Sequence, residues 1–286
     1  MISKLKLLMY LVHVFFSPNP KVFWWSMINS GSSKKENLGD ILTPYIINKI
    51  SGIKPINFDP SRGYSKYIKH SIMVGSIINK SNVNTIVWGS GIISSNQIIK
   101  GGNFLAVRGP RTYKRLQELG FKPNKIFGDP GILMSSLYKP KKIIKKYKFG
   151  IIPHYVDFKE IKNIYKDKSD FKIIKLLIDK NKIEETIDQI NECEQIISSS
   201  LHGLILADTY QIPNAWLKFS DKLSGDDVKF YDYFESVGRL ESYNTSIIEI
   251  IKNKSLNMAN FEILSLIKNN LLKAYPYKIK KKYACR

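Results

Sequence analysis

The chain has 286 residues, of which 43% are hydrophobic and 24% charged, so it is long and apolar enough to bury sizeable cores. Its two cysteines, Cys193 and Cys285, exclude a disulfide scaffold and a cysteine-based zinc site, and they fit a reducing compartment. The net charge of +21 allows nucleic acid, an anionic membrane or acidic substrates as partners. Lysine is spread along the whole chain, however, and no zinc-finger, RNA-recognition or basic-zipper signature occurs, which argues against nucleic acid.

An apolar stretch lies near the N-terminus, from residue 5 to residue 16, and is interrupted by Lys6 and His13. It is shorter than the roughly 20 residues that span a bilayer, and no small-residue cleavage site of a signal peptide follows it. We therefore expect residues 1–17 to form a short helix. Two placements of this helix stay open, against the body of the protein or on a membrane surface.

The first half alternates between strand and helix patterns, which favours a mostly parallel sheet. Apolar residues at helical spacing predict a helix over residues 41–50, with Asp40 as its N-cap and Gly52 at its end. A second helix is expected to start at Pro110 and to end near Gly120. Short apolar runs predict strands over residues 22–27, 85–88 and 104–107.

The second half repeats this alternation after a basic, proline-containing segment, residues 139–148, which we interpret as a linker. Helices are expected over residues 183–193, 204–210 and 258–273, and strands over residues 149–152, 171–178, 195–197 and 215–217. The sequence therefore predicts an α/β fold with an N-terminal domain over residues 1–140, a C-terminal domain over 147–256, and a terminal helix with a basic tail over 257–286.

Polar or glycine-containing loops follow several predicted strands, and open α/β sheets bind ligands at the carboxyl ends of their strands. His202 comes after a short strand and three serines, at the start of a helix. The N–H groups there favour anions, and the imidazole can exchange protons near neutral pH. Arg108 has the same placement in the first half, and its guanidinium can hold phosphate or carboxylate. The plain alternatives are a histidine that only caps its helix and an arginine that forms an ion pair.

Two weaker candidates accompany them. Asn37, Gly39 and Asp40 combine a flexible glycine with a helix N-cap, and simple capping explains them without further support. His154, after Pro153, could donate a proton or contact phosphate. The sequence has no metal-ligand cluster, no G-x-S-x-G, no P-loop and no G-x-G-x-x-G, which argues against a serine hydrolase, a kinase and a nicotinamide enzyme.

In their order along the chain these segments resemble the polysaccharide pyruvyl transferase family, and within it the branch of exopolysaccharide ketal pyruvyl transferases. Each segment is short, and their joint order makes the resemblance specific. The matching segments lie between about residues 22 and 240: Asn37–Asp40, Val87–Gly91, Ala106–Thr112, Gly128–Pro130, Pro153–His154, Ser198–Gly203 with Ala207–Asp208, and Lys229–Tyr233.

The resemblance implies two Rossmann-like domains that face a cleft in a GT-B-like fold. It implies phosphoenolpyruvate as the donor substrate. We expect no cofactor, and no metal because the sequence has no metal-ligand cluster. The implied acceptor is a sugar of a surface polysaccharide or of its lipid-linked precursor, on which a cyclic pyruvate ketal forms. The resemblance matches the family's histidine to His202, as the catalytic residue, and its donor-binding arginine to Arg108. The other expected substrate contacts are Asn37, Gly39, Asp40, Ser90, Gly91, His154, Ser199, Ser200, Leu201, Gly203 and Lys229.

One position departs from the family pattern. Many members carry an arginine two residues before the histidine, where this chain has Ser200. A cation that could hold the donor's phosphate or carboxylate is therefore missing. Three residues could replace it, and the sequence leaves the choice open: Arg111, Lys218 and Lys229.

We expect a cytoplasmic location with peripheral contact to the inner face of the cell membrane. The apolar N-terminal stretch and Lys278–Lys282 would make this contact, because basic residues are attracted to anionic lipid. Two other functions stay open. One is a glycosyltransferase of the same architecture with a nucleotide-sugar donor, although the second half shows no acidic donor motif. The other is a non-catalytic basic protein that binds membrane or nucleic acid.

Overall fold

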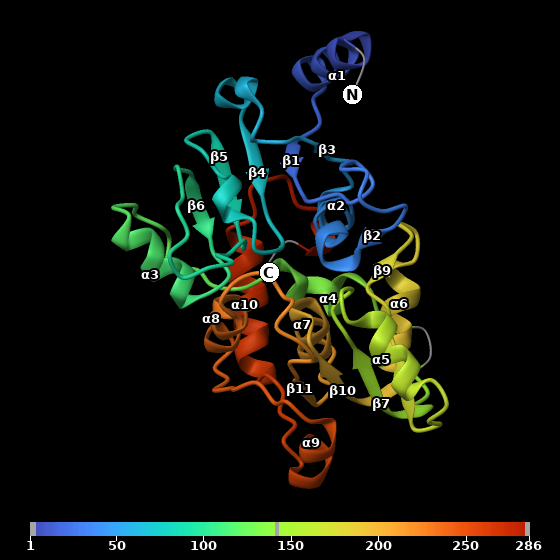
Figure 1. Cartoon of the computed structure of the whole chain (residues 1–286). Helices are drawn as coiled ribbons and strands as arrows, with labels where there is room; N and C mark the ends of the chain where they lie inside the picture. Colours follow the sequence, from blue (N-terminus) through green and yellow to red (C-terminus); the bar gives the residue numbers. More distant parts are fainter. Residues whose placement is uncertain (1–3, 141–142, 284–286) are drawn as a thin grey trace.

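The chain has an α/β fold with two parallel sheets, as the sequence predicts (Figure 1). The structure is a computed structural model that describes residues 4–140 and 143–283. Residues 1–3, 141–142 and 284–286, which fall within the predicted N-terminal helix, linker and basic tail, lie outside the described residues. None of the helices within the described ranges is long and apolar enough to cross a membrane.

The first sheet has five parallel strands in the order β3-β1-β4-β5-β6. Its strands are β1 (Lys21–Phe23), β3 (Ile56–Asn57), β4 (His70–Ile72), β5 (Thr85–Trp88) and β6 (Asn103–Ala106). The second sheet has four parallel strands in the order β11-β10-β7-β8. They are β7 (Tyr147–Ile152), β8 (Phe171–Ile173), β10 (Cys193–Ser198) and β11 (Asn214–Trp216).

A two-stranded antiparallel pair joins the halves, because β2 (Glu36–Asn37) pairs with β9 (Leu177–Ile178). The α-helices are α1 (Lys4–Phe16), α2 (Leu38–Ser51), α3 (Pro110–Glu118), α4 (Met134–Leu137), α5 (Phe158–Tyr165), α6 (Ile183–Asn191), α7 (Leu201–Thr209), α8 (Val228–Ser236), α9 (Ile247–Asn253) and α10 (Phe261–Lys273). Short 3₁₀ helices are η1 (Gly63–Tyr67), η2 (Ile78–Lys80), η3 (Pro130–Leu133) and η4 (Lys281–Tyr283).

Three details of the sequence prediction are wrong. Asn37, and not Asp40, caps α2, because its side chain accepts a hydrogen bond from the Gly39 N–H and the helix starts three residues earlier than predicted. The strand expected over residues 22–27 ends at Phe23, since the buried Glu36 carboxylate holds the next residues in a loop. The strand expected over residues 171–178 divides into β8 and β9, which pair with different partners.

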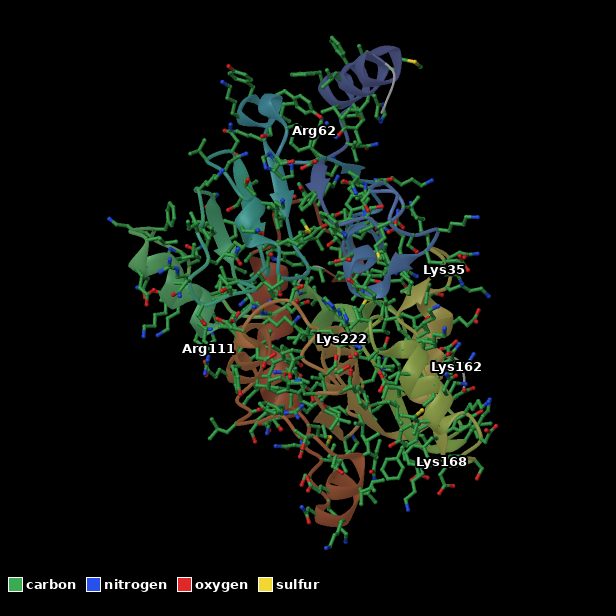
Figure 2. The ribbon with its side chains drawn as sticks, in the orientation of Figure 1. Lys35, Arg62, Arg111, Lys162, Lys168 and Lys222 are labelled. Atoms are coloured by element: carbon green, nitrogen blue, oxygen red, sulfur yellow. The ribbon has the colours of Figure 1, made fainter. Side chains whose placement is uncertain are left out.

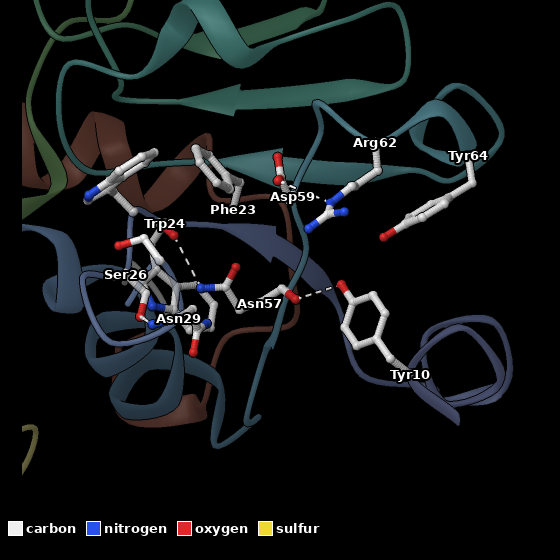
Figure 3. Close-up of a pocket in the computed structure, with 11 residues that line it drawn as sticks. Tyr10, Phe23, Trp24, Ser26, Asn29, Asn57, Asp59, Arg62 and Tyr64 are labelled. Atoms are coloured by element: carbon white, nitrogen blue, oxygen red, sulfur yellow. Dashed lines mark hydrogen bonds and ion pairs between the residues drawn. The ribbon is translucent and has the colours of Figure 1, made fainter. Parts of the chain in front are cut away.

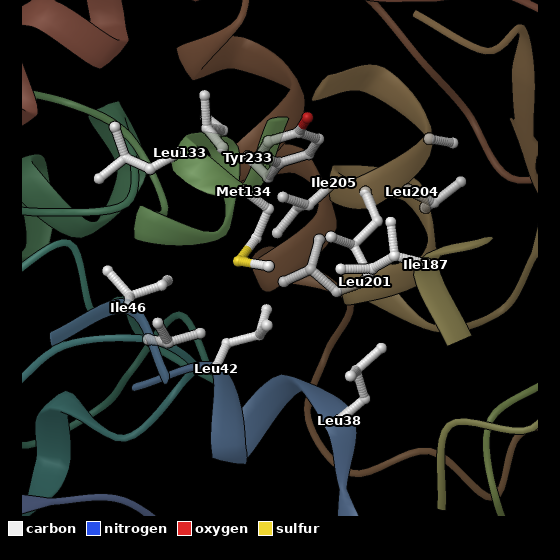
Figure 4. Packing of buried hydrophobic residues seen from close by; sticks show 14 of the residues in the cluster. Leu38, Leu42, Ile46, Leu133, Met134, Ile187, Leu201, Leu204, Ile205 and Tyr233 are labelled. Atoms are coloured by element: carbon white, nitrogen blue, oxygen red, sulfur yellow. The ribbon is translucent and has the colours of Figure 1, made fainter. Parts of the chain in front are cut away.

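The two halves share one hydrophobic core (Figure 4). Leu42 of α2, Met134 of α4 and Ile205 of α7 belong to the same buried cluster, with η3 packed against both α2 and α7. At the C-terminus, α10 returns to the first half, where the Trp88 indole N–H donates to the Leu271 carbonyl at 2.9 Å. This shared core positions the loops that follow the strands of both sheets.

Candidate functional site

The predicted site residues come from loops and helix starts at the carboxyl ends of strands in both sheets. β10 ends at Ser198 and leads into α7 with His202, and β6 ends at Ala106 and leads to Arg108. The segment around Gly39 reaches the same place from the start of α2, because Gly39 packs directly on His202. The structure thus brings together residues that are more than 160 positions apart in the sequence.

His202 lies in the first turn of α7 with its side chain 13% exposed. Its Nε2 atom is 3.9 Å from Oδ2 of Asp129, a fully buried carboxylate. Neither atom has a hydrogen-bond partner among the described residues. The other carboxylate oxygen, Oδ1, accepts a 2.8 Å hydrogen bond from the Gly131 N–H and so fixes Asp129 at the start of η3. The two residues form a close acid–imidazole pair that is too long for a direct hydrogen bond.

Gly39 forms the wall on which the His202 ring rests. A Cβ atom at this position would lie 2.0 Å from Nδ1 of His202, far inside the contact distance. Asn37 holds this wall in place by accepting the Gly39 N–H at 2.9 Å. The glycine is therefore explained by a close approach within the protein, and Asn37 by helix capping.

The protonation state of His202 follows from its surroundings. Burial lowers the pKa of the imidazole, Asp129 opposes this by raising it, and the charges of Arg108 and Lys229 lower it further. The imidazole is therefore neutral at pH 7. It is suited to accept a proton from a substrate and not to donate one.

Arg108 is fully buried, and its charge already has partners in the protein. Its Nε donates to Oδ2 of Asp232 at 3.0 Å, and its two terminal nitrogens donate at 2.6 Å to Ser76 Oγ and to the Ile92 carbonyl. A Cβ at Gly91 would lie 2.5 Å from the guanidinium carbon, so Gly91 makes room for this arginine. Arg108 thus forms an ion pair within the protein, which was the alternative to donor binding. Its charge still lowers the pKa values of Lys229 and His202.

Lys229, in the first turn of α8, is the best placed of the three cations that could replace the missing arginine. Arg111 pairs with Glu235 at 2.7 Å, and Lys218 pairs with Asp227 at 2.9 Å. No carboxylate within residues 4–140 and 143–283 lies at ion-pair distance from Lys229. Burial and the Arg108 charge, opposed by the Asp227 charge, lower the pKa of Lys229 to about 8.

The serine segment and His154 join the ends of two neighbouring strands, β7 and β10. Ser199 Oγ accepts a 2.8 Å hydrogen bond from the His154 backbone N–H. Burial, together with the Lys229 charge, lowers the pKa of His154 to about 4. Ser200 is the N-cap residue of α7, and both Leu201 and Gly203 are buried in the packing behind it.

Two more predicted residues lie on the first-half side. Ser90 is fully buried, and its hydroxyl donates to the Gly75 carbonyl at 2.8 Å, which ties two loops together. Asp40 is half-buried and follows Gly39 directly in α2. Burial, together with the nearby Glu36 charge, raises the pKa of Asp40 to about 7. The carboxyl group of Asp40 is thus partly protonated at neutral pH.

Asp129 and Asp232 received no role from the sequence, although both lie within segments that carry the family resemblance. Their partners, His202 and Arg108, are 73 and 124 positions away, so the pairs exist only in the folded chain. The turn pattern Asp129-Pro130-Gly131 was the available signal for the first of them.

A cavity of about 560 Å³ opens between α1 and the loop that follows β1 (Figure 3). None of the predicted site residues lines it. Its walls are Tyr10, Phe23, Trp24, Trp25, Ser26, Asn29, Ser30, Asn57, Asp59, Arg62 and Tyr64. Within the described parts of the chain, no group of three or more His, Cys, Asp or Glu side chains is placed to hold a metal ion.

The sequence matches the family model of polysaccharide pyruvyl transferases over residues 8–221. The chain belongs to the polysaccharide pyruvyl transferase family. Membership makes it a transferase that acts on polysaccharides. The ordered segments from Asn37 to His202, on which the sequence resemblance rests, lie within the matched range.

Among similar proteins is the uncharacterized protein L143 of Acanthamoeba polyphaga mimivirus, 33% identical over 249 residues that cover 82% of this chain and 83% of that protein. The succinoglycan biosynthesis protein ExoV of Rhizobium meliloti is 25% identical over 173 residues, which cover 58% of this chain and 52% of ExoV. A solved structure of a functionally uncharacterized protein from Klebsiella pneumoniae gives a TM-score of 0.49 at 15% identity, over 85% of this chain and all of that one.

Proposed function

We propose that this transferase moves the enolpyruvyl group of phosphoenolpyruvate onto a sugar and closes it into a cyclic pyruvate ketal. The family match and the similarity to a succinoglycan biosynthesis protein support the exopolysaccharide branch. The observation that carries the proposal is the His202 imidazole beside Asp129, with its pKa lowered by burial and by the charge of Lys229, a lysine that has no carboxylate at ion-pair distance among the described residues. It combines a proton acceptor with a cation for an anionic donor.

Donor binding uses Lys229 and the N-terminus of α7. Phosphoenolpyruvate carries a phosphate and a carboxylate. No carboxylate among the described residues lies at ion-pair distance from Lys229, although the charge of Asp227, which pairs with Lys218, raises the pKa of Lys229. Backbone N–H groups of the first turn of α7, after Ser200, add donors for an anion. Arg108 keeps Asp232 as its ion-pair partner and acts on Lys229 and His202 through its charge alone.

The reaction begins with proton transfer to the methylene carbon of phosphoenolpyruvate, which becomes the methyl group of the product. Asp40 donates this proton, since its pKa of about 7 leaves part of the carboxyl protonated at neutral pH. The adjacent carbon becomes oxocarbenium-like. A sugar hydroxyl attacks it, and the hydroxyl proton passes to His202.

Phosphate then leaves as the carbon–oxygen bond to it breaks. A second hydroxyl attacks the same carbon and closes the ketal, and its proton leaves with the phosphate. Asp129 faces the Nε2 atom of His202, so its negative charge stabilises the imidazolium that forms after the first attack. Each turnover takes one proton from Asp40 and gives one to His202. Before the next turnover His202 releases its proton to solvent and Asp40 takes one up from solvent, which balances the reaction.

The overall arrangement we propose is GT-B-like, with two Rossmann-like domains over residues 1–140 and 147–256 and a terminal segment over 257–286. Its support is the two successive parallel sheets, which both contribute residues to the site. The acceptor is a sugar of a surface polysaccharide or of its lipid-linked precursor.

Phosphate release from phosphoenolpyruvate in the presence of acceptor preparations tests the proposal. His202→Ala should lower the rate by about 10²- to 10⁴-fold, the usual contribution of acid–base help, while circular dichroism stays unchanged. His13→Ala, an exposed histidine on α1, is the control. Near-wild-type release by His202→Ala would refute the assignment.

A thermal-shift comparison separates the donor classes. Phosphoenolpyruvate should raise the melting temperature of the wild type and raise it less for Lys229→Gln. A rise with nucleotide sugars and none with phosphoenolpyruvate would replace the proposal with a glycosyltransferase.

A further inference from the structure

Helix α1 lies at one end of the molecule (Figure 1). It presents an apolar face to solvent. Met9 is 65% exposed, Val12 49%, Phe15 55% and Phe16 84%. At about 100° per residue these four side chains fall within an arc of about 120° on the helix. Single exposed apolar residues are common, but four on one helical face, two of them phenylalanines, indicate an interaction surface.

The opposite face of α1 is anchored to the body, which fixes where the apolar face points. Val14 is fully buried in a cluster with Phe58 and Ile68. The Tyr10 hydroxyl donates to the Asn57 carbonyl at 3.0 Å. Because these contacts hold one side of the helix, the exposed side cannot turn inward without breaking them.

The segment around η1 extends this surface with positive charge. α1 precedes β1 and η1 precedes β4, and these two strands are parallel neighbours, so both helices lie at the amino-end edge of the first sheet. Figure 2 shows Arg62 beside α1 at that end of the molecule. The apical surface, as we name it, consists of Met9, Val12, Phe15, Phe16, Arg62, Lys66, Tyr67 and Lys69, all of them exposed.

Acidic residues are scarce in this part of the chain. Residues 1–117 contain 16 lysines and arginines but only three acids, and none of the acids lies between residues 60 and 117. Of the three, Glu36 is fully buried and Asp59 lies 3.5 Å from Arg62. The positive charge around α1 is therefore largely uncompensated by nearby carboxylates.

We propose that the apical surface binds the surface of an anionic lipid bilayer. α1 lies in the interface with its four apolar side chains among the acyl chains, and Lys66 and Lys69 contact lipid phosphates, while Arg62 keeps Asp59 as its partner. A nucleic acid would use the charges but leave the apolar face in water. A second copy would bring two basic surfaces together, which like-charge repulsion opposes.

This placement does not depend on the donor or the acceptor of the reaction. The apical surface lies at the amino-end edge of the first sheet, whereas the residues around His202 lie at carboxyl ends of strands. Binding through α1 therefore leaves the candidate site facing away from the bilayer.

Sedimentation of the whole protein with vesicles tests the proposal. The wild type should bind vesicles of phosphatidylcholine mixed with phosphatidylglycerol at 0.1 M salt, bind far less at about 0.5 M, and not bind phosphatidylcholine alone. Phe15→Ser with Phe16→Ser should lower the partition coefficient at least about tenfold. The matched control is Ile248→Ser with Phe261→Ser, two exposed apolar residues in α9 and at the start of α10.

The charge contribution has its own variant pair. Lys66→Gln with Lys69→Gln should lower the partition coefficient about 25-fold, near fivefold for each lysine. Lys162→Gln with Lys166→Gln, in and directly after α5, should change it far less. Circular dichroism confirms that every variant is folded.

Four outcomes would overturn the proposal. They are binding to neither vesicle type, equal binding to both, the same loss in the control pairs, and a concentration-dependent dimer that disappears in the double phenylalanine variant. The last result would assign the surface to a second copy of the chain.

Discussion

A single added methyl group at Gly39 should displace His202. A Cβ there would lie 2.0 Å from Nδ1, 2.5 Å from Cε1 and 2.6 Å from Cγ of the ring, whereas ordinary contacts begin at 3.4 Å. The ring must therefore retreat by about 1.4 Å, the difference between 3.4 and 2.0 Å. Gly39 lies in the first turn of α2 without a positive φ, so its backbone accepts alanine.

The consequences of Gly39→Ala for rate and stability differ. A displacement of about 1 Å at a reacting group can cost about 10²-fold in rate, and we expect at least that loss of phosphate release. Alanine favours a helix over glycine by about 0.5–1 kcal/mol, which offsets part of the roughly 1–3 kcal/mol of overpacking. The free energy of unfolding should therefore fall by no more than about 2.5 kcal/mol.

Two measurements check this reasoning. The first is phosphate release with an acceptor, and the second is the ¹H–¹³C resonance of the His202 ring, which should shift in the variant. Gly63→Ala is the matched control, because a Cβ there meets nothing within 4 Å. An unchanged resonance with wild-type turnover would refute the packing argument, and so would an equal loss in Gly63→Ala.

Three further predictions concern charges at the site. An anion bound at Lys229 should raise the pKa of this lysine from about 8. Calorimetry with phosphoenolpyruvate at pH 8–9 in two buffers should therefore show proton uptake in the wild type and none in Lys229→Gln. Proton uptake that persists in the variant would contradict the assignment. Asp40 must be protonated to act, so the wild-type rate should fall as the pH rises above about 7, and Asp40→Asn should lose about 10²–10⁴-fold in rate. Because folding raises the pKa of Asp40 from 3.8, the wild type loses stability as the pH rises from about 4 to 7. Asp40→Asn should therefore be the more stable protein at pH 8, as measured by denaturant unfolding. Equal stability of the two proteins at pH 8 would contradict the raised pKa.

Local patterns predicted the elements that depend on local sequence. The strand over residues 85–88 and the helix that starts at Pro110 match the structure, because a continuous apolar run and a proline at the first helical position are themselves local signals. The short strands β3 and β4 were not predicted. Two or three residues become a strand only through their neighbours in the sheet, which the sequence pattern does not show.

The sequence proposes candidate site residues, but it does not show the contacts that these residues make. The order of segments selected His202, Arg108 and Lys229, and these residues act on one another electrostatically in the fold. The sequence could not show that Arg108 forms an ion pair with Asp232, 124 positions later. Lys229 remains as a cation with no carboxylate at ion-pair distance among the described residues. Its role as the replacement for the missing arginine at Ser200 is a proposal that rests on this geometry.

Asp129 offers the sharpest test of how His202 works. The Asp129 carboxylate raises the pKa of His202 against the effects of burial, Arg108 and Lys229. Asp129→Asn keeps the size of the side chain and the Oδ1 acceptor that holds the Gly131 N–H, but it removes the charge 3.9 Å from Nε2. The pKa of His202 should therefore fall further, which NMR titration of the ring measures.

The rate of Asp129→Asn should fall because the imidazolium formed during the reaction loses its counter-charge. Two charges about 4 Å apart interact by about 4 kcal/mol at an effective dielectric constant of 20, so a loss of about 10²- to 10³-fold in kcat is expected. The KM for phosphoenolpyruvate should stay near the wild-type value, since Asp129 contacts no donor group in the proposed mechanism. A raised KM with unchanged kcat would instead make Asp129 part of donor binding, and unchanged kinetics would leave it a cap of η3 only.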